Sequence, residues 1–213
     1  MKYNCIIWDW NGTLLDDVSA SLRSVNDMLV KRGKPPIDIN RYRECIGVPI
    51  KHFYEQVFEI EKEDYSLLLK EYNEGYEYYV NLDCGIADGA TELLEEIKQA
   101  GAKQIIVSSC EKNQLFAAVK KSGVGGYFDA VLGADDYFAT SKIDRARDYL
   151  KNNLPEKSKL LAVGDLLHDY QLAAELGADC VLVKSGHEDT GRLLASGAFT
   201  ADNVADVKRF IFG

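Results

Sequence analysis

Short apolar runs, separated by longer stretches of helical character, constrain the fold more than any other feature of the sequence. Most of these runs are continuously apolar rather than alternating, which is typical of strands buried on both faces of a parallel sheet. The segments between them are amphipathic, as in DGATELLEEIKQ at 88–99. Strands that alternate with helices predict an α/β fold with a doubly wound, mainly parallel sheet. The apolar runs lie at residues 4–10, 103–109, 128–133, 159–165 and 179–185.

One segment breaks this alternation. Residues 16–83 hold no convincing strand and contain helical stretches such as SASLRSVNDMLVKRG. A crossover between parallel strands needs only about a dozen residues, so most of this segment is surplus to the sheet. We therefore predict a helical cap domain at 16–83, inserted into an α/β core domain formed by 1–15 plus 84–213.

The charge balance and the cysteines limit the partners. The formal net charge is −9, whereas nucleic acids and anionic membranes attract basic surfaces. No apolar window approaches the length of a membrane span. The 5 cysteines contain no C-x-x-C pair, which favours reduced thiols. We expect a soluble cytoplasmic protein, monomeric or homodimeric, that binds neither nucleic acid nor membrane.

Polar side chains follow several of the expected strands. In a doubly wound sheet, ligands bind beyond the carboxyl ends of the strands, so these side chains are expected to converge. Alone, each is explained by helix capping or by an exposed position. Together they supply a carboxylate nucleophile, hydroxyl donors, a lysine and further acids, which is the set that phosphoryl transfer needs. They are Asp9, Gly12, Thr13, Ser108, Ser109, Lys142, Asp165 and Asp169.

These residues stand in four short motifs that resemble those of the haloacid dehalogenase (HAD) superfamily. In order they are DWNGTL (9–14), IIVSSC (105–110), TSK (140–142) and VGDLLHD (163–169). The resemblance covers nearly the whole chain. The helical insert after the first motif is similar to the cap of phosphoglycolate phosphatases and β-phosphoglucomutases. The resemblance implies a phosphatase that acts on a small phosphorylated metabolite.

The resemblance also implies a role for each matching residue. Asp9 matches the nucleophile that forms an aspartyl-phosphate. Mg²⁺ would be held by Asp9, the backbone carbonyl of Asn11 and Asp165, with support from Asp169.

The phosphate-binding positions follow from the same comparison. Ser108 matches the hydroxyl that binds the phosphate, and Ser109 occupies the next, often polar, position. Lys142 matches the lysine that neutralises phosphate and nucleophile. Gly12, in the turn after Asp9, belongs to the same expected set.

Asn11 departs from the pattern. Phosphatases of the family usually place Asp there, which protonates the leaving oxygen and then activates water. Asn cannot exchange a proton at neutral pH, and losing a positioned general acid typically costs about 10²–10⁴-fold. Either the enzyme prefers leaving groups that depart as stable anions, or another group substitutes. Asp16, Asp17, His52 and Glu55 are the candidates, although the first two are also explained as helix-initiating acids.

Two alternative functions remain. DWNGT is close to the D-W-A-G-T sequence of phosphonoacetaldehyde hydrolases, for which Lys51 would be the Schiff-base lysine, although an exposed helix lysine is the ordinary explanation. The other alternative is a non-catalytic phosphate-binding or regulatory module, against which the retained charged cluster argues. His187, in a turn after the last apolar run, is a candidate near the same edge, and Asp135 and Asp136 are expected close to the metal.

Overall fold

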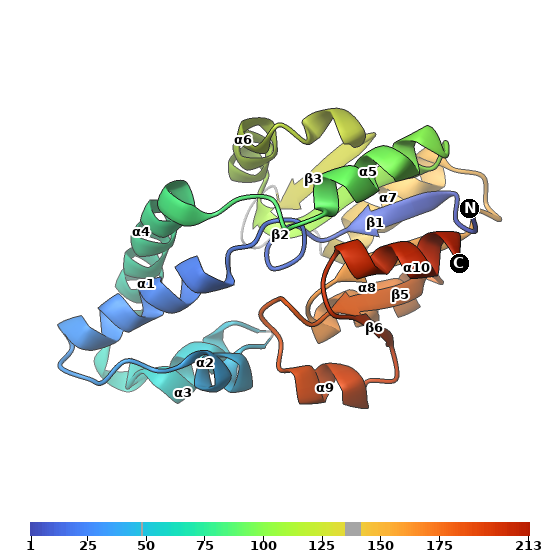
Figure 1. The fold of residues 1–213 in the computed structure, drawn as a ribbon. Coiled ribbons are helices and arrows are strands. Elements are labelled where there is room, and N and C mark those ends of the chain that lie inside the picture. The colour runs from blue at the N-terminus through green and yellow to red at the C-terminus, as the bar shows by residue number, and fades with distance from the viewer. Residues whose placement is uncertain (48, 135–141) are drawn as a thin grey trace.

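A single parallel sheet forms the centre of the protein (Figure 1). The computed structural model describes residues 1–47, 49–134 and 142–213. Within these residues the sheet is 6-stranded, in the order β3-β2-β1-β4-β5-β6. This confirms the predicted α/β fold. The strands are β1 (Cys5–Trp8), β2 (Lys103–Glu111), β3 (Ala130–Ala134), β4 (Leu160–Gly164), β5 (Asp179–Val183) and β6 (Phe199–Ala201).

The strand order places a switch point beside β1. The chain adds β2 and β3 on one side of β1 and then β4, β5 and β6 on the other. Ligand sites in such sheets lie at the carboxyl ends of the strands at this reversal. The residues after β1 and β4 therefore occupy the expected position for a site. The sequence does not predict β6, because a strand of 3 residues is too short to show a periodic pattern.

Helices cover both faces of the sheet. Side chains alternate along β1, so Ile6 and Trp8 join the apolar cluster on one face, while Cys5 and Ile7 join the cluster on the other. Burying one such aliphatic side chain contributes about 1.5–3 kcal/mol. The first face is covered by α5 (Ala90–Gln99), α6 (Lys112–Ser122) and α10 (Lys208–Phe212), the second by α7 (Lys142–Asn153), α8 (Leu167–Leu176) and α9 (Thr190–Ala195).

Four further helices follow β1 and lie beyond the carboxyl ends of the strands (Figure 1). We call them the cap helices: α1 (Val18–Lys31), α2 (Ile39–Cys45), α3 (Lys51–Val57) and α4 (Tyr65–Asp83). They pack around an apolar cluster of their own, in which Val25, Tyr54 and Leu68 are fully buried. The domain boundaries at 16–83 stay a prediction.

Three short 3-10 helices complete the described chain: η1 (Ile60–Lys62), η2 (Gly125–Tyr127) and η3 (Ala205–Val207). Among the described residues, none of the helices combines the length and the apolar character needed to cross a membrane.

Candidate active site

Asp9 directly follows β1 at the switch point. Its backbone N–H donates to the carbonyl oxygen of Val163 (2.8 Å), which extends the pairing of β1 with β4 by one residue. The residue is only 8% exposed. Burial raises the pKa of Asp9 to about 6, although the neighbouring Lys142 lowers it. A buried carboxylate held at a strand end has the fixed position that a nucleophile requires.

Lys142, the first residue of α7, joins two carboxylates. Its Nζ donates to Asp9 Oδ1 and to Asp169 Oδ1, both at 2.6 Å. Burial disfavours the charge on Lys142, but the two adjacent carboxylates outweigh it and raise the pKa of the ammonium group. The structure thus brings together three of the residues that the sequence proposes for the site.

Asp165 completes a group of buried acids, which we call the acidic cluster: Asp9, Asp165 and Asp169. Each offers one carboxylate oxygen, and these oxygens lie within 4.8 Å of one another. Burial raises the pKa of Asp165 to about 8, and Asp9 and Asp169 add to this effect. Three acids face one lysine, so negative charge is in excess when all are ionised.

The acidic cluster fits a small divalent cation. Mg²⁺ takes oxygen ligands at about 2.0–2.1 Å, so two ligands of one ion are at most about 4.2 Å apart. The observed spacing requires only small side-chain movements to reach this geometry. Asp169 is already fixed, because its Oδ2 accepts the backbone N–H groups of Asp165 (3.2 Å) and Leu166 (3.1 Å).

Gly12 packs against the cluster. Its φ is +69°, and a Cβ there would lie 2.2 Å from Asp165 Oδ2 and 2.4 Å from His187 Cδ2. Any larger residue would displace a carboxylate of the cluster. The Gly12 N–H donates to Asp17 Oδ1 (2.7 Å), so a phosphate contact by this N–H would compete with Asp17. Its predicted role in phosphate binding stays a prediction.

The two serines lie at the carboxyl end of β2, next to β1. Trp8 pairs with Ile106, so Ser108 follows at the same sheet edge as Asp9. Ser108 is 2% exposed and its Oγ accepts the backbone N–H of Cys110 (3.1 Å), whereas Ser109 is exposed. Their predicted contact with phosphate stays a prediction.

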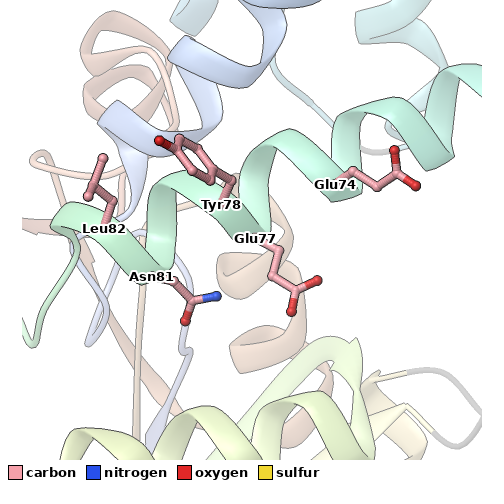
Figure 2. Close-up of a pocket in the computed structure, with 5 residues that line it drawn as sticks. All are labelled: Glu74, Glu77, Tyr78, Asn81 and Leu82. Carbon is pink, nitrogen blue, oxygen red and sulfur yellow. The ribbon is translucent and has the colours of Figure 1, made fainter.

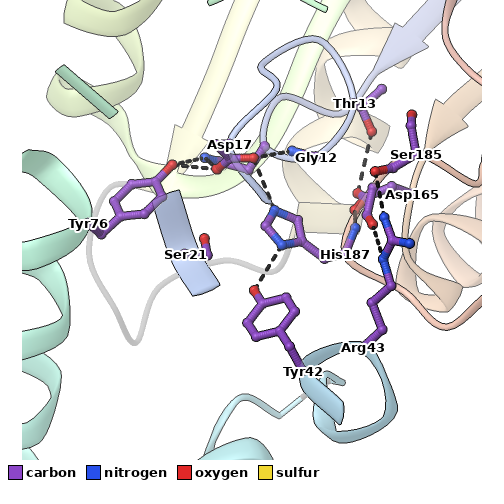
Figure 3. A network of polar contacts seen from close by, with 12 residues as sticks. Gly12, Thr13, Asp17, Ser21, Tyr42, Arg43, Tyr76, Asp165, Ser185 and His187 are labelled. Carbon is purple, nitrogen blue, oxygen red and sulfur yellow. Dashed lines mark hydrogen bonds and ion pairs between the residues drawn. The ribbon is translucent and has the colours of Figure 1, made fainter. Parts of the chain in front are cut away.

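The Asn11 side chain contacts Asp17 and Tyr76. Its Nδ2 lies 2.8 Å from Asp17 Oδ2 and 2.7 Å from the Tyr76 hydroxyl. Asp17 is 1% exposed, and it also accepts hydrogen bonds from Tyr76 and His187 (Figure 3). Burial raises the pKa of Asp17, but His187 and the other donors outweigh it and hold the pKa below its usual range. Asp17 is therefore an ionised acceptor, which argues against its use as a substitute acid.

We call this set the Asp17 network: Asp17 with Asn11, Gly12, Tyr76 and His187. The sequence singled out His187 only as a residue near the edge, and Tyr76 not at all. His187 Nδ1 is also 2.9 Å from the Tyr42 hydroxyl of α2 (Figure 3). The network thus connects cap helices to loops of the sheet. No local signal marks it, because its members come from distant segments.

The expected cap residues lie elsewhere. Lys51, His52 and Glu55 are exposed on α3, and Lys51 pairs with Glu55 at 3.7 Å. In the described ranges, no hydrogen bond or ion pair joins them to the acidic cluster. Asp16 is exposed. Asp135 and Asp136 fall outside the described residues.

A surface hollow on α4 is separate from this site. It is lined by Glu74, Glu77, Tyr78, Asn81 and Leu82, all from one helix (Figure 2). It contains no residue of the acidic cluster and none of the Asp17 network. The buried charges, not this hollow, define the candidate site.

Known proteins resemble the chain over most of its length. The family model described as haloacid dehalogenase-like hydrolase matches residues 6–183. A 5′-nucleotidase of Pseudomonas aeruginosa is 26% identical over 92% of this chain and 89% of its own. A phosphoglycolate phosphatase of Pseudomonas fluorescens is also 26% identical, over 93% and 76%. A solved haloacid dehalogenase-like hydrolase from Streptococcus pneumoniae superposes with a TM-score of 0.81 at 20% identity, covering 99% of each chain.

Proposed function

Because the chain belongs to the haloacid dehalogenase-like hydrolase family, we propose that it is a Mg²⁺-dependent phosphatase of small phosphorylated metabolites. The observation that carries this proposal is the buried group of Asp9, Lys142, Asp165 and Asp169 at the switch point of the sheet. Holding three carboxylates this close together in a buried site costs free energy of folding unless a cation binds there, since like charges at this spacing repel. A phosphate with its cation is the ligand that matches it.

Asp9 is the proposed nucleophile. One carboxylate oxygen would attack phosphorus and form an aspartyl-phosphate, and the ester oxygen would leave with the bonding electron pair. Lys142 holds Asp9 Oδ1 at 2.6 Å, so it fixes the direction of the attacking carboxylate. Its ammonium group also offsets the negative charge that phosphate brings into a buried site. Water then hydrolyses the acyl-phosphate and regenerates Asp9.

Asp9, Asp165 and the backbone carbonyl of Asn11 would hold the cation, with support from Asp169. When bound, Mg²⁺ would supply positive charge beside the phosphate oxygens. The chain's own contribution is to fix the ligands. Asp165 Oδ2 accepts the His187 N–H (2.7 Å) and its Oδ1 lies 3.4 Å from Thr13 Oγ1, so both of its oxygens are positioned by the protein.

The cap helices and the relatives support a small substrate. The cap helices lie beyond the strand ends, where they restrict access by a polymer and exclude water (Figure 1). The names of the two curated relatives, 5′-nucleotidase and phosphoglycolate phosphatase, both denote removal of phosphate from a small molecule.

The test is phosphate release in Mg²⁺ from p-nitrophenyl phosphate and from an alkyl phosphate, with Asp9→Asn as the blank. We expect turnover of the aryl ester well above the blank. Release from neither ester above the blank would refute the phosphatase proposal and leave carbonyl-phosphonate hydrolysis and the non-catalytic module as the alternatives.

A further inference from the structure

The loop between β5 and α9, residues 184–189, packs directly on Asp165. The backbone N–H of His187 donates to Asp165 Oδ2 (2.7 Å). At Gly186 the backbone comes so close that a Cβ there would lie 2.2 Å from the Cβ of Asp165. The other hydrogen bond that the described residues give to this carboxylate, from Thr13, is longer (3.4 Å). The direction of the Asp165 carboxylate therefore depends on where the loop lies.

The cap helix α2 holds the same loop at three successive residues (Figure 3). Arg43 Nη2 donates to the carbonyl oxygen of Ser185 (3.0 Å), and Arg43 Nε donates to that of Gly186 (3.1 Å). The Tyr42 hydroxyl lies 2.9 Å from His187 Nδ1. Because the donors of a guanidinium group stand in a fixed planar arrangement, binding two neighbouring carbonyls fixes the orientation of the loop relative to α2.

Arg192 of α9 joins the two segments from the other side. Its guanidinium group donates to the carbonyl oxygens of Arg43 (2.7 Å), Glu44 (3.1 Å) and Ile46 (2.8 Å). These carbonyls lie at the C-terminal end of α2, where carbonyl groups lack a partner within the helix and a cationic side chain is favourable. We call these contacts the α2 clasp: Tyr42 and Arg43 on α2, Arg192 on α9, and the loop residues Ser185, Gly186 and His187.

We propose that Arg43 is a positioning residue for the cation site. By holding the loop on α2, it fixes the Asp165 carboxylate in the direction that Mg²⁺ needs. The route is short: Arg43 binds Gly186, and the next residue in the chain donates to Asp165. The clasp thus links α2 to the acidic cluster through the loop. This inference rests on the proposed Mg²⁺-dependent function and extends it to the cap helices.

The clasp can change the affinity for the cation without touching it. A cation binds more tightly when its ligands are already oriented, and removing a group that orients a ligand typically weakens binding about 10–100-fold. Such coupling is reciprocal. The factor by which the clasp strengthens the binding of Mg²⁺ is the factor by which Mg²⁺ strengthens the clasp.

The first experiment measures the dissociation constant of Mg²⁺ by titration calorimetry, in the protein without substrate. We expect Arg43→Met to weaken binding about 10–100-fold, because the loop loses two hydrogen bonds. Arg43→Lys should have an intermediate effect, since one ammonium group cannot reproduce the planar arrangement of donors. Arg41→Met is the matched control and should leave the affinity unchanged, because Arg41 is exposed on the same helix and pairs with Glu44.

Two further readings separate positioning from a general loss of structure. Tyr42→Phe removes only a hydroxyl and keeps the ring that packs against Phe53, with centroids 5.5 Å apart. It should weaken Mg²⁺ binding in the same direction but by less than Arg43→Met. In Arg43→Met, turnover of p-nitrophenyl phosphate should fall at limiting Mg²⁺ and recover in excess Mg²⁺, a rescue that a misfolded variant would not show.

Hydrogen exchange measures the coupling in the reverse direction. In the natural protein, saturating Mg²⁺ should slow the exchange of the α2 backbone amides by about the same factor. It should slow those of α3 less, since in the part of the chain that the structure describes α3 forms no hydrogen bond with residues 184–189. Equal slowing in α2 and α3 would show a general stabilisation and overturn the coupling.

The outcomes distinguish this inference from the proposed function. Equal affinity for Mg²⁺ in the natural protein and in Arg43→Met overturns the role of Arg43, while the proposed function stands. If Mg²⁺ binding depends on Arg43 but no ester shows release dependent on Asp9, the proposed function fails and the role of Arg43 stands. No binding of Mg²⁺ to the natural protein would overturn both.

Discussion

The acidic cluster and the Asp17 network lie next to each other but are opposite in their electrostatic balance. In the acidic cluster, three buried carboxylates have one lysine between them, so negative charge is in excess when all three are ionised. In the Asp17 network, one buried carboxylate receives four donors and is complete without a ligand. The first arrangement is built to bind a cation, and the second to hold side chains in place.

Among the residues that the structure describes, the cap helices form hydrogen bonds with only one of the two. Tyr76 from α4 and Tyr42 from α2 reach the Asp17 network. Arg43 from α2 also donates to the carbonyl oxygens of Ser185 (3.0 Å) and Gly186 (3.1 Å). These two residues belong to the loop that carries His187, so Arg43 connects this loop to α2. The acidic cluster is formed by residues of the strand ends and of α8, and Lys142 of α7 contacts it. The residues proposed for catalysis therefore differ from those that contact the cap helices, and substitutions can test the two sets separately.

Among the variants that compare the two regions, Lys142→Met should change the free energy of unfolding most. It leaves the acidic cluster without its cation, and breaking a buried ion pair typically costs about 3–5 kcal/mol. We expect the free energy of unfolding to fall by about this amount in EDTA and to recover in part in excess Mg²⁺. Chemical denaturation under both conditions measures it. Equal loss with and without Mg²⁺ would mean that the cluster does not bind the ion.

Asp17→Ala should also destabilise the protein by leaving buried polar groups without a partner, but Mg²⁺ should not restore the lost stability. It removes the acceptor of His187, Tyr76 and Asn11, and buried donors left unsatisfied cost about 1–3 kcal/mol each before relaxation. We expect a loss of about 2–4 kcal/mol that Mg²⁺ does not restore.

Asp16→Ala is the matched control for this change. Asp16 is exposed, and substitutions at such positions usually stay within about 0.5 kcal/mol. A loss at Asp16 equal to that at Asp17 would show that the effect comes from the helix start rather than from the network.

Asp165→Asn tests the excess of negative charge directly. The natural protein should gain about 2.7 kcal/mol of stability at a Mg²⁺ concentration of about 100 times its dissociation constant. The variant should lose this gain, while its stability in EDTA stays unchanged or rises because repulsion is relieved. If the variant is less stable in EDTA and is still stabilised by Mg²⁺, Asp165 stabilises the fold rather than binding the cation.

The sequence predicts the acidic cluster well for a physical reason. Asp9, Asp165 and Lys142 each lie at the end of a strand or the start of a helix, and parallel strands deliver their carboxyl ends to one edge. Identifying the strands therefore suffices to bring these residues together. The same logic places Ser108 at that edge.

The Asp17 network could not be predicted in this way. Asp16 and Asp17 are identical neighbours in the sequence, yet one is exposed and the other is 1% exposed. Tyr76 and Tyr42 reach the network only because of how the cap helices pack on one another, and the sequence pattern of a helix does not fix that packing. Lys51, His52 and Glu55 had the right chemistry but lie on an exposed side of α3.

The smallest expected effect is a pH dependence of stability, which Mg²⁺ and a variant of His187 divide between the two regions. Burial disfavours the charged form of His187, but Asp17 outweighs it and, with Asp165 and Asp9, raises the pKa of His187 to about 9. A raised pKa gives stability that is fully present below the ordinary value of 6.5 and is lost as the pH rises through about 9. From about pH 7 to about pH 8.5 we expect His187 to contribute a loss of about 1–2 kcal/mol.

His187→Gln should remove the part of the loss that comes from His187, because Gln keeps a donor for Asp17 and does not titrate. The measurement is the free energy of unfolding across this range in EDTA, with His52→Gln as control, since His52 is exposed on α3. Asp9 and Asp165 of the acidic cluster act in the same direction. Burial raises the pKa of Asp9 to about 6 and that of Asp165 to about 8, so ionisation of these two acids also weakens the fold as the pH rises, and Mg²⁺ should cancel that part. A loss in the natural protein that Mg²⁺ abolishes completely would therefore place its origin in the acidic cluster and not in His187.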